Sequence, residues 1–209
     1  MIAIIDYKAG NLTSVKLAFE TLGVDACITS DPDLISNAER VVFPGVGAAA
    51  AAMRNLQQMG LIPTIQQVVQ RQTPFLGICL GTQIILDHSE EDGGVQTLGL
   101  IPGKVIRFQP RNPRDKVPHM GWNRVQVKRQ HPLLANIPDN SEFYFVHSYY
   151  PLPQNPENRF AETTYADVAF SAALGHQNIF ATQFHPEKSG RIGLQLLRNF
   201  TTWNPKGTN

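Results

Sequence analysis

Cysteine is scarce in this chain: the 209 residues include two, Cys27 and Cys79. Two cysteines do not make the disulfide framework that stabilises small secreted domains, and they fit a reducing compartment better. Cys27 lies in a segment expected to form a strand over residues 24–29, so we interpret it as a packing residue. Cys79 therefore remains the thiol whose surroundings can indicate chemistry.

The chain also lacks an excess of charge of either sign and lacks long apolar runs. Lys and Arg number 18 and Asp and Glu 17, for a formal net charge of +1, which favours neither a nucleic acid nor an anionic membrane as partner. No apolar run approaches the roughly 20 residues that cross a bilayer. Residues 1–6 lack the basic segment of a signal peptide and are typical of a first core strand. We expect a cytoplasmic protein, or one in an organelle stroma if a transit peptide has been removed.

A chain of 209 residues that is 42% hydrophobic can bury a sizeable core, and we expect one domain over residues 1–209. In the first half, apolar strand patterns alternate with helical patterns, which predicts an α/β fold with a mostly parallel central sheet and helices on both faces. Residues 103–184 are richer in proline, aromatic residues and alternating segments, which predicts added antiparallel strands. The expected strands are residues 1–7, 24–29, 40–43 and 74–79, and the expected helices begin near 11, 31, 48 and 189.

Local signals place several helix ends. Asn11 can cap the first helix, which we expect to end at Gly23, and Asp31 precedes Pro32 at the first position of the next. Ser189 can cap a closing helix that runs through Phe200. Residues 204–209 are expected to fray.

Residues 74–81 form the most informative segment, because a buried strand is expected to turn there abruptly into a helix. A small residue two positions to each side of a nucleophile, here Gly77 and Gly81 around Cys79, is the pattern of a nucleophile elbow with Cys in place of Ser. The free N–H groups at the helix start favour the thiolate, which is the reactive form. A buried packing cysteine is the simpler alternative, and the two glycines favour chemistry.

A nucleophile needs a base, and His185 stands out among the six histidines. Pro186 disfavours the α region at His185 and favours extended backbone. In an extended chain Glu187 would lie on the same side as His185, where a carboxylate can orient the imidazole. A surface His and Glu at a strand end is the alternative, but together with Cys79 these residues predict a Cys-His-Glu triad.

Residues 44–47 offer a place for an oxyanion. They follow the short apolar strand 40–43 and precede a run of helix-forming residues, so glycines at 45 and 47 can leave N–H groups exposed at a helix start. The N–H of Leu80, directly after the nucleophile, is the other expected donor. Gly45, Gly47 and Ala50 also fit a dinucleotide-binding spacing, but residues 65–69 lack the acidic residue that such a site needs.

The segments around Cys79 and His185 resemble the class I (triad) glutamine amidotransferases. Further segments resemble the branch of that family that serves histidine biosynthesis, the glutaminase subunits of imidazole glycerol phosphate synthase. These segments are residues 6–7 with 10–11, 43–47, 99–103, 117–123 and 144–149, and the likeness extends to Ser189. The run from Val117 to Asn123 narrows the resemblance most.

The resemblance implies hydrolysis of glutamine and transfer of the ammonia to a (β/α)₈-barrel cyclase, which then makes imidazole glycerol phosphate and aminoimidazole carboxamide ribotide. It implies a heterodimer with that partner and no metal or organic cofactor. The residues with implied roles are Cys79, His185 and Glu187 in catalysis; Val46 and Leu80 in the oxyanion hole; Gly47, Gln83, His147, Ser148 and Tyr149 at the substrate; and Asn11, Trp122 and Lys188 at the partner.

Simpler readings stay open for several of these residues. Gln83 could be an ordinary polar residue near a helix start, residues 147–149 ordinary strand, and Lys188 a solvated surface side chain. His119 and Trp122 lack a chemical signature of their own, and we interpret them as structural or interface residues. His88 with the acidic residues 90–92 matches no standard metal site, so we expect a solvated acidic loop. Thr82 replaces the methionine usual in the family, which could alter packing behind the nucleophile.

Two rival functions also remain. One is the glutaminase subunit of another amidotransferase, such as those of anthranilate or pyridoxal phosphate synthesis, against which the 117–123 run argues. The other is a regulatory subunit that kept the fold but lost catalysis, against which the intact Cys79, His185 and Glu187 argue.

Overall fold

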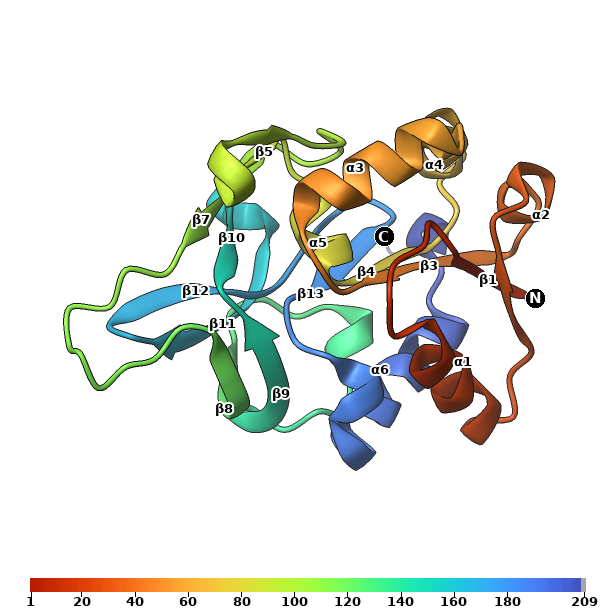
Figure 1. The fold of residues 1–209 in the computed structure, drawn as a ribbon. Coiled ribbons are helices and arrows are strands. Elements are labelled where there is room, and N and C mark those ends of the chain that lie inside the picture. Colours follow the sequence, from red (N-terminus) through yellow and green to blue (C-terminus); the bar gives the residue numbers. More distant parts are fainter. Residues whose placement is uncertain (208–209) are drawn as a thin grey trace.

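A computed structural model describes residues 1–207 of the chain (Figure 1). The expected fraying at 204–209 falls partly on residues 208 and 209, which lie outside the described residues. Residues Pro205–Gly207 form one turn of 3₁₀ helix (η5) instead of a frayed end.

Within residues 1–207, nine strands form one sheet in the order β2-β1-β3-β4-β13-β12-β11-β8-β9, and four more form a second sheet in the order β10-β7-β5-β6. The strands of the first sheet are β1 (Ile2–Ile5), β2 (Ala26–Thr29), β3 (Arg40–Gly45), β4 (Phe75–Cys79), β8 (His119–Val127), β9 (Ser141–His147), β11 (Arg159–Tyr165), β12 (Val168–His176) and β13 (Ile179–Thr182). Those of the second are β5 (His88–Ser89), β6 (Val95–Gln96), β7 (Gly103–Arg107) and β10 (Tyr149–Pro153).

The first sheet changes character along its width. Strands β2, β1, β3, β4 and β13 pair in parallel, whereas β13, β12, β11, β8 and β9 pair antiparallel. The parallel half is built almost entirely from the first 79 residues, and only β13 joins it from the end of the chain. The predicted α/β class, with antiparallel strands added in the second half, is confirmed.

Helices cover both faces of the parallel half (Figure 1). They are α1 (Leu12–Thr21), α2 (Pro32–Ser36), α3 (Ala49–Gln58), α4 (Leu61–Gln70), α5 (Leu80–Ile84) and α6 (Gly190–Thr202), with short 3₁₀ turns η1 (Glu91–Gly93), η2 (Pro132–Leu134), η3 (Pro156–Asn158) and η4 (Pro186–Lys188). The buried faces of α1 and α6 share one hydrophobic cluster, and those of α2 to α5 share the other.

Strand β1 shows why both faces must be covered. Ile2 and Ile4 belong to the cluster under α1 and α6, while Ala3 and Ile5 belong to the cluster on the opposite face. Alternate residues of a strand point to opposite faces, so a strand that is apolar throughout is buried on both.

Two predicted helix caps are wrong. Asn11 and Ser189 occupy the N-cap positions of α1 and α6, but within the described residues neither side chain accepts a hydrogen bond from its helix. Asp31 does cap α2, accepting from the N–H groups of Asp33 and Leu34. The two failed caps have longer-range partners, which place them at the candidate site.

None of the helices in residues 1–207 combines the length and the apolar character needed to cross a membrane.

Three buried or half-buried histidines are kept neutral by their surroundings. Burial lowers the pKa of His119 and of His131 to about 4, with the nearby Arg129 charge adding to the effect at His131. Burial lowers the pKa of His147 to about 3, opposed by its hydrogen bond to the Tyr149 carbonyl. These imidazoles lose solvation that water gives them in the unfolded chain, where their ordinary pKa is about 6.5.

The lowered pKa values predict acid sensitivity. Between pH 6.5 and 5 these three histidines bind protons in the unfolded chain but not in the folded chain. Their contribution to the free energy of unfolding is therefore fully present above pH 6.5 and falls as the pH drops towards the pKa values of the folded state. His131 accepts the Leu133 N–H through Nδ1, a bond that an Asn side chain can replace. His131→Asn should therefore make the fall in melting temperature between pH 6.5 and 5 shallower. A slope equal to that of the unchanged chain would contradict this account.

Candidate active site

Cys79 lies at the carboxyl end of β4 and directly before α5. Its backbone dihedrals, φ 53° and ψ −106°, are unusual for a non-glycine residue and confirm the predicted sharp turn. A Cβ on Gly81 would come within 1.8 Å of the Phe43 carbonyl oxygen, and one on Gly77 within 3.0 Å of the Ala181 Cβ. The elbow needs both glycines because neighbouring backbone and side chains pack against them.

Parallel pairing brings three chain segments to the same edge of the sheet. Gly45 is opposite Cys79 in the register of β3 and β4, and Thr182 is opposite Ile78 in the register of β13 and β4. The residues after β3 and after β13 therefore flank the thiol on either side. The carboxyl ends of parallel strands are where α/β folds commonly bind ligands.

His185 and Glu187 form a buried pair beside the elbow. His185 Nδ1 lies 2.7 Å from Glu187 Oε1, and Asn11 Nδ2 donates to the same oxygen at 2.6 Å. The predicted proximity is confirmed, but the expected backbone is only partly so. His185 itself is extended, whereas residues 186–188 form the 3₁₀ turn η4, and this turn brings the carboxylate back onto the ring.

Backbone hydrogen bonds hold the imidazole in place. The His185 N–H donates to the Tyr144 carbonyl at 2.9 Å, and the Ser189 hydroxyl donates to the His185 carbonyl at 2.6 Å. The same hydroxyl accepts the Tyr144 N–H at 3.0 Å. Ser189 thus ties His185 to β9 instead of capping α6.

The surroundings of His185 favour the imidazolium. Burial alone lowers its pKa, but interactions with Cys79 and Glu187 outweigh burial and raise the pKa to about 10. A nearby thiolate and carboxylate both stabilise a proton on the ring. Burial, with the charge of Cys79, raises the pKa of Tyr7, whose hydroxyl lies within 2.0 Å of where a Gly45 Cβ would be.

Among the described residues, the sulfur of Cys79 takes part in two hydrogen bonds besides its interaction with His185. It lies 3.9 Å from the Val146 carbonyl oxygen, to which the thiol donates, and 3.7 Å from Gln183 Nε2, which donates to it. In the part of the chain that the structure describes, His185 Nε2 and Glu187 Oε2 are buried without a hydrogen-bond partner. The Nε2 nitrogen of His185 can therefore meet the thiol or a ligand in the pocket.

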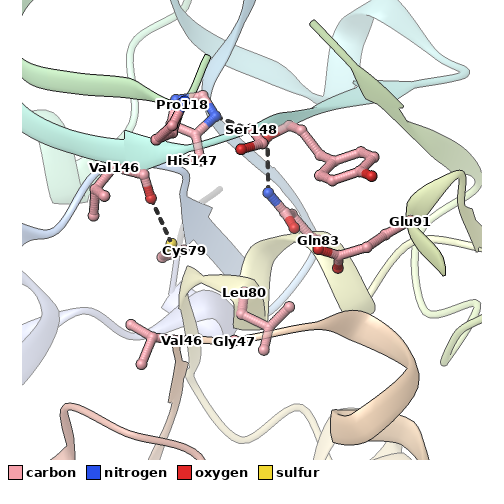
Figure 2. Close-up of a pocket in the computed structure, with 11 residues that line it drawn as sticks. Val46, Gly47, Cys79, Leu80, Gln83, Glu91, Pro118, Val146, His147 and Ser148 are labelled. Atoms are coloured by element: carbon pink, nitrogen blue, oxygen red, sulfur yellow. Dashed lines mark hydrogen bonds between the residues drawn. The ribbon is translucent and has the colours of Figure 1, made fainter.

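A pocket of about 350 Å³ opens above the thiol, a volume in the range of small-molecule sites (Figure 2). Besides Cys79, the lining includes seven residues with implied roles: Val46, Gly47, Leu80, Gln83, His147, Ser148 and Tyr149. Three others were not identified from the sequence, namely Glu91, Pro118 and Val146. The structure thus gathers both the elbow cysteine and the expected substrate residues around one cavity.

Gln83 faces Cys79 across this pocket, but its amide nitrogen is occupied. Nε2 donates to the Tyr149 carbonyl at 2.9 Å and to Gln183 Oε1 at 3.0 Å. An amide nitrogen carries two hydrogens, so both are used and only Oε1 can meet a ligand.

The expectation of a solvated acidic loop at residues 90–92 is wrong for Glu91. Its carboxylate accepts the Ala49 N–H at 2.7 Å, at the start of α3, and it is half-buried on the pocket wall (Figure 2). Burial raises the pKa of Glu91, while the bond from Ala49 opposes the shift. No local sequence pattern indicates this contact, because 42 residues separate the two partners.

The two glycines near the expected oxyanion hole are needed for different reasons. Gly47 has a φ of 113°, which favours glycine, but Gly45 ends β3, where it is required because Tyr7 packs against it. Val46 and Gly47 line the pocket beside Leu80, so these backbone segments surround the thiol.

Two further residues support the elbow from behind. Thr82 is buried, and its hydroxyl donates to the Thr182 carbonyl on β13 at 2.6 Å. This bond ties α5 to the sheet and gives the departure from the family's methionine a structural role. Gln183 is also fully buried, and no sequence pattern predicts that it belongs to the site.

The three residues expected at a partner surface lie around the triad. Lys188 is exposed and follows Glu187, while Asn11 is half-buried with its amide on Glu187. Trp122 on β8 is 56% exposed, and its ring lies against that of Tyr144, the residue that holds His185. His119 on the same strand is buried, stacked against Tyr165, which supports a structural role.

Comparisons with known proteins agree with this geometry. The family model for glutamine amidotransferase class-I matches residues 3–203. The imidazole glycerol phosphate synthase subunit HisH of Geobacter sulfurreducens is 49% identical over 204 residues, 95% of this chain and 97% of that one. The subunit of the same name from Nitrosococcus oceani is 50% identical over 205 residues, 97% of each chain.

Solved structures share the fold at low sequence identity. The structure of PurLQS from Thermotoga maritima aligns with a TM-score of 0.71 at 15% identity, covering 96% of each chain. The glutaminase domain of Trypanosoma brucei CTPS, solved with bound acivicin, aligns with a TM-score of 0.66 at 19% identity, covering 96% of this chain and 93% of that one. The chain belongs to the class I glutamine amidotransferases and, within them, to the family of HisH subunits of imidazole glycerol phosphate synthase.

Proposed function

We propose that this chain hydrolyses glutamine to glutamate and ammonia through Cys79, His185 and Glu187, and that it supplies the ammonia to a partner enzyme. The observation that carries the proposal is the elbow cysteine at the base of a pocket, with a buried histidine-carboxylate pair beside it. Nucleophile, base and orienting carboxylate in this order are the requirements of acyl transfer.

In the proposed reaction, the Cys79 thiolate attacks the side-chain amide carbon of glutamine. The Val46 and Leu80 N–H groups stabilise the oxyanion, and the His185 imidazolium protonates the departing ammonia. The resulting glutamyl thioester is hydrolysed by a water that His185 activates as a base. Glu187 keeps Nδ1 protonated and oriented through both steps, and Asn11 holds Glu187.

The pocket also suggests how free glutamine is oriented. Gln83 offers only its Oε1 acceptor, and Glu91 offers a carboxylate; both side chains point into the pocket (Figure 2). Two acceptors, one of them charged, suit the α-ammonium group of a free amino acid. The ammonium would also offset the cost of burying the Glu91 charge. Gly47 and residues 147–149 complete the proposed substrate wall.

The partner in this proposal is a (β/α)₈-barrel cyclase that uses the ammonia to make imidazole glycerol phosphate and aminoimidazole carboxamide ribotide. The names of the relatives support an assembly of this kind, since they are subunits of imidazole glycerol phosphate synthase. Asn11, Trp122 and Lys188 would face the barrel. We also propose that residues 1–209 act as one domain in the cytoplasm, where a catalytic thiol stays reduced.

The two rival functions are less well supported. The relatives at 49% and 50% identity carry the histidine-pathway name over nearly the whole chain, which disfavours service to another amidotransferase. A non-catalytic subunit would have no need for a buried imidazole held between a thiol and a buried carboxylate.

The first test of this function removes the nucleophile. Cys79→Ala should abolish glutamine hydrolysis, with a loss on the order of 10⁶ in rate, because no other group on this site can form the thioester. Synthesis by the complex should survive when ammonia is supplied in solution. Glu187→Ala should lose less, because Glu187 orients the base and transfers no proton. Glutamine-dependent synthesis by the Cys79→Ala complex would refute the assignment.

A second test concerns the proposed ammonium contact. Glu91→Gln should raise KM for glutamine by roughly tenfold or more, with a smaller change in kcat, because a charge-assisted hydrogen bond is lost. Asp92→Asn is the matched control, since it removes the same charge from the adjacent exposed position. Steady-state hydrolysis assays measure both parameters, and equal KM values for the two variants would argue against the contact.

A third test concerns the partner surface. Lys188→Ala should weaken the coupling between hydrolysis and the cyclase reaction, together with the affinity for the cyclase, more than it weakens glutamine hydrolysis itself. An exposed ion pair contributes only about 0.2–1 kcal/mol, so the expected loss of affinity is up to about fivefold. Lys206→Ala, at another exposed lysine, is the control. Isothermal titration calorimetry measures the affinity of each variant for the cyclase. Equal affinities for the two variants would show that Lys188 is a solvated surface residue.

A further inference from the structure

Gln183 directly follows β13 and does not line the substrate pocket, yet its side chain contacts the nucleophile. It is fully buried, and its Nε2 lies 3.7 Å from the Cys79 sulfur. Its Oε1 accepts from Gln83 at 3.0 Å, and Gln83 also donates to the Tyr149 carbonyl at 2.9 Å. A continuous line of hydrogen bonds therefore joins a backbone carbonyl to the sulfur.

The direction of this line is fixed by its first member. A backbone carbonyl can only accept, so Gln83 must present its nitrogen to Tyr149. Its second hydrogen then points to Gln183, whose amide must present its oxygen to Gln83. Turning the Gln183 amide over would place two donors against each other. The N–H of Gln183 is therefore obliged to face the sulfur.

The two contacts of the sulfur favour opposite protonation states. The Val146 carbonyl at 3.9 Å can accept from a thiol but repels a thiolate, whereas an N–H donor stabilises the thiolate. When the thiol loses its proton, the contact to Val146 becomes unfavourable and that to Gln183 strengthens. The sulfur is then free to turn to the side of His185, whose Nε2 is buried and unpaired among the described residues.

We propose that Gln183 is a positioning residue for the nucleophile, whose amide N–H, oriented by Gln83 and the Tyr149 carbonyl, holds the Cys79 thiolate in its attacking orientation. This inference rests on the proposed function, but it concerns the thiol itself and can be tested without glutamine. The titratable groups that face Cys79 are Tyr7 and His185, with Glu187 behind the imidazole, and His147 and Glu91 on the pocket wall.

The test measures how fast iodoacetamide alkylates Cys79 as a function of pH, with Cys27→Ser as the background so that one thiol reacts. Gln183→Glu keeps the shape of the side chain but turns an acceptor towards the sulfur. Gln183→Met removes the donor and keeps the length. Both should move the midpoint of the alkylation profile upward, by about one pH unit for the lost charge-assisted bond in Gln183→Met and by more in Gln183→Glu.

The kinetic signature should agree with the alkylation profile. In Gln183→Glu, which keeps an acceptor for Gln83, glutamine hydrolysis near pH 7 should lose at least roughly tenfold in kcat with KM nearly unchanged, because Gln183 does not line the pocket. Asn178→Leu is the control, since it removes another buried amide next to β13, one whose nitrogen binds the Thr73 carbonyl away from the thiol. It should lower the melting temperature but leave the alkylation midpoint in place.

An unchanged midpoint in either folded Gln183 variant would overturn the proposal. If neither variant folds, NMR spectroscopy of the unsubstituted chain tests the proposal. The side-chain amide resonances of Gln183 should shift in NMR spectra with the same midpoint as the alkylation of Cys79. Resonances that do not respond to that titration would also overturn it. An unchanged alkylation midpoint in the Gln183 variants, with glutamine hydrolysis intact, would overturn this inference but not the proposed function. Absence of hydrolysis in the unsubstituted complex would refute the proposed function alone.

Discussion

The close approach of Gly81 to the Phe43 carbonyl is the constraint on which the site depends. Because a Cβ there would lie 1.8 Å from the carbonyl oxygen, α5 can begin directly against β3 only with glycine at this position. This contact lets the chain reverse at Cys79 with a positive φ and keeps Leu80 next to Val46 and Gly47 at the pocket. The thiol, the expected oxyanion donors and the start of the substrate wall are therefore set by one backbone contact.

The parts of the site that the sequence predicted are those encoded by neighbouring residues. The glycines around Cys79 and the run from His185 to Glu187 act over a few positions, and the structure keeps both as expected. The alternation of apolar strands and helices likewise predicted the parallel half of the sheet. The backbone over residues 186–188 differs from the prediction, but the pairing is kept because the turn that follows extended His185 brings the Glu187 carboxylate back onto the ring.

The parts that could not be predicted depend on contacts between distant segments. Asn11 and Ser189 both have the side chains of helix caps, and only the fold offers them the competing partners Glu187 and the His185 carbonyl. The acidic loop near residue 91 is expected to be solvated from its sequence, but in the fold the Glu91 carboxylate accepts the Ala49 N–H at the start of α3. Gln183 has no local signature at all, since its partners lie about a hundred residues earlier in the chain.

These long-range contacts place catalysis and the proposed partner surface on the same groups. Asn11 holds the carboxylate that orients His185, and Tyr144 accepts the His185 N–H while packing against exposed Trp122. A protein that covers Asn11, Trp122 and Lys188 would therefore press on the supports of the base and not only on an outer surface. If a partner covers this surface, coupling between its binding and hydrolysis needs no separate relay through the fold, because Asn11 donates to Glu187 and Trp122 packs against Tyr144.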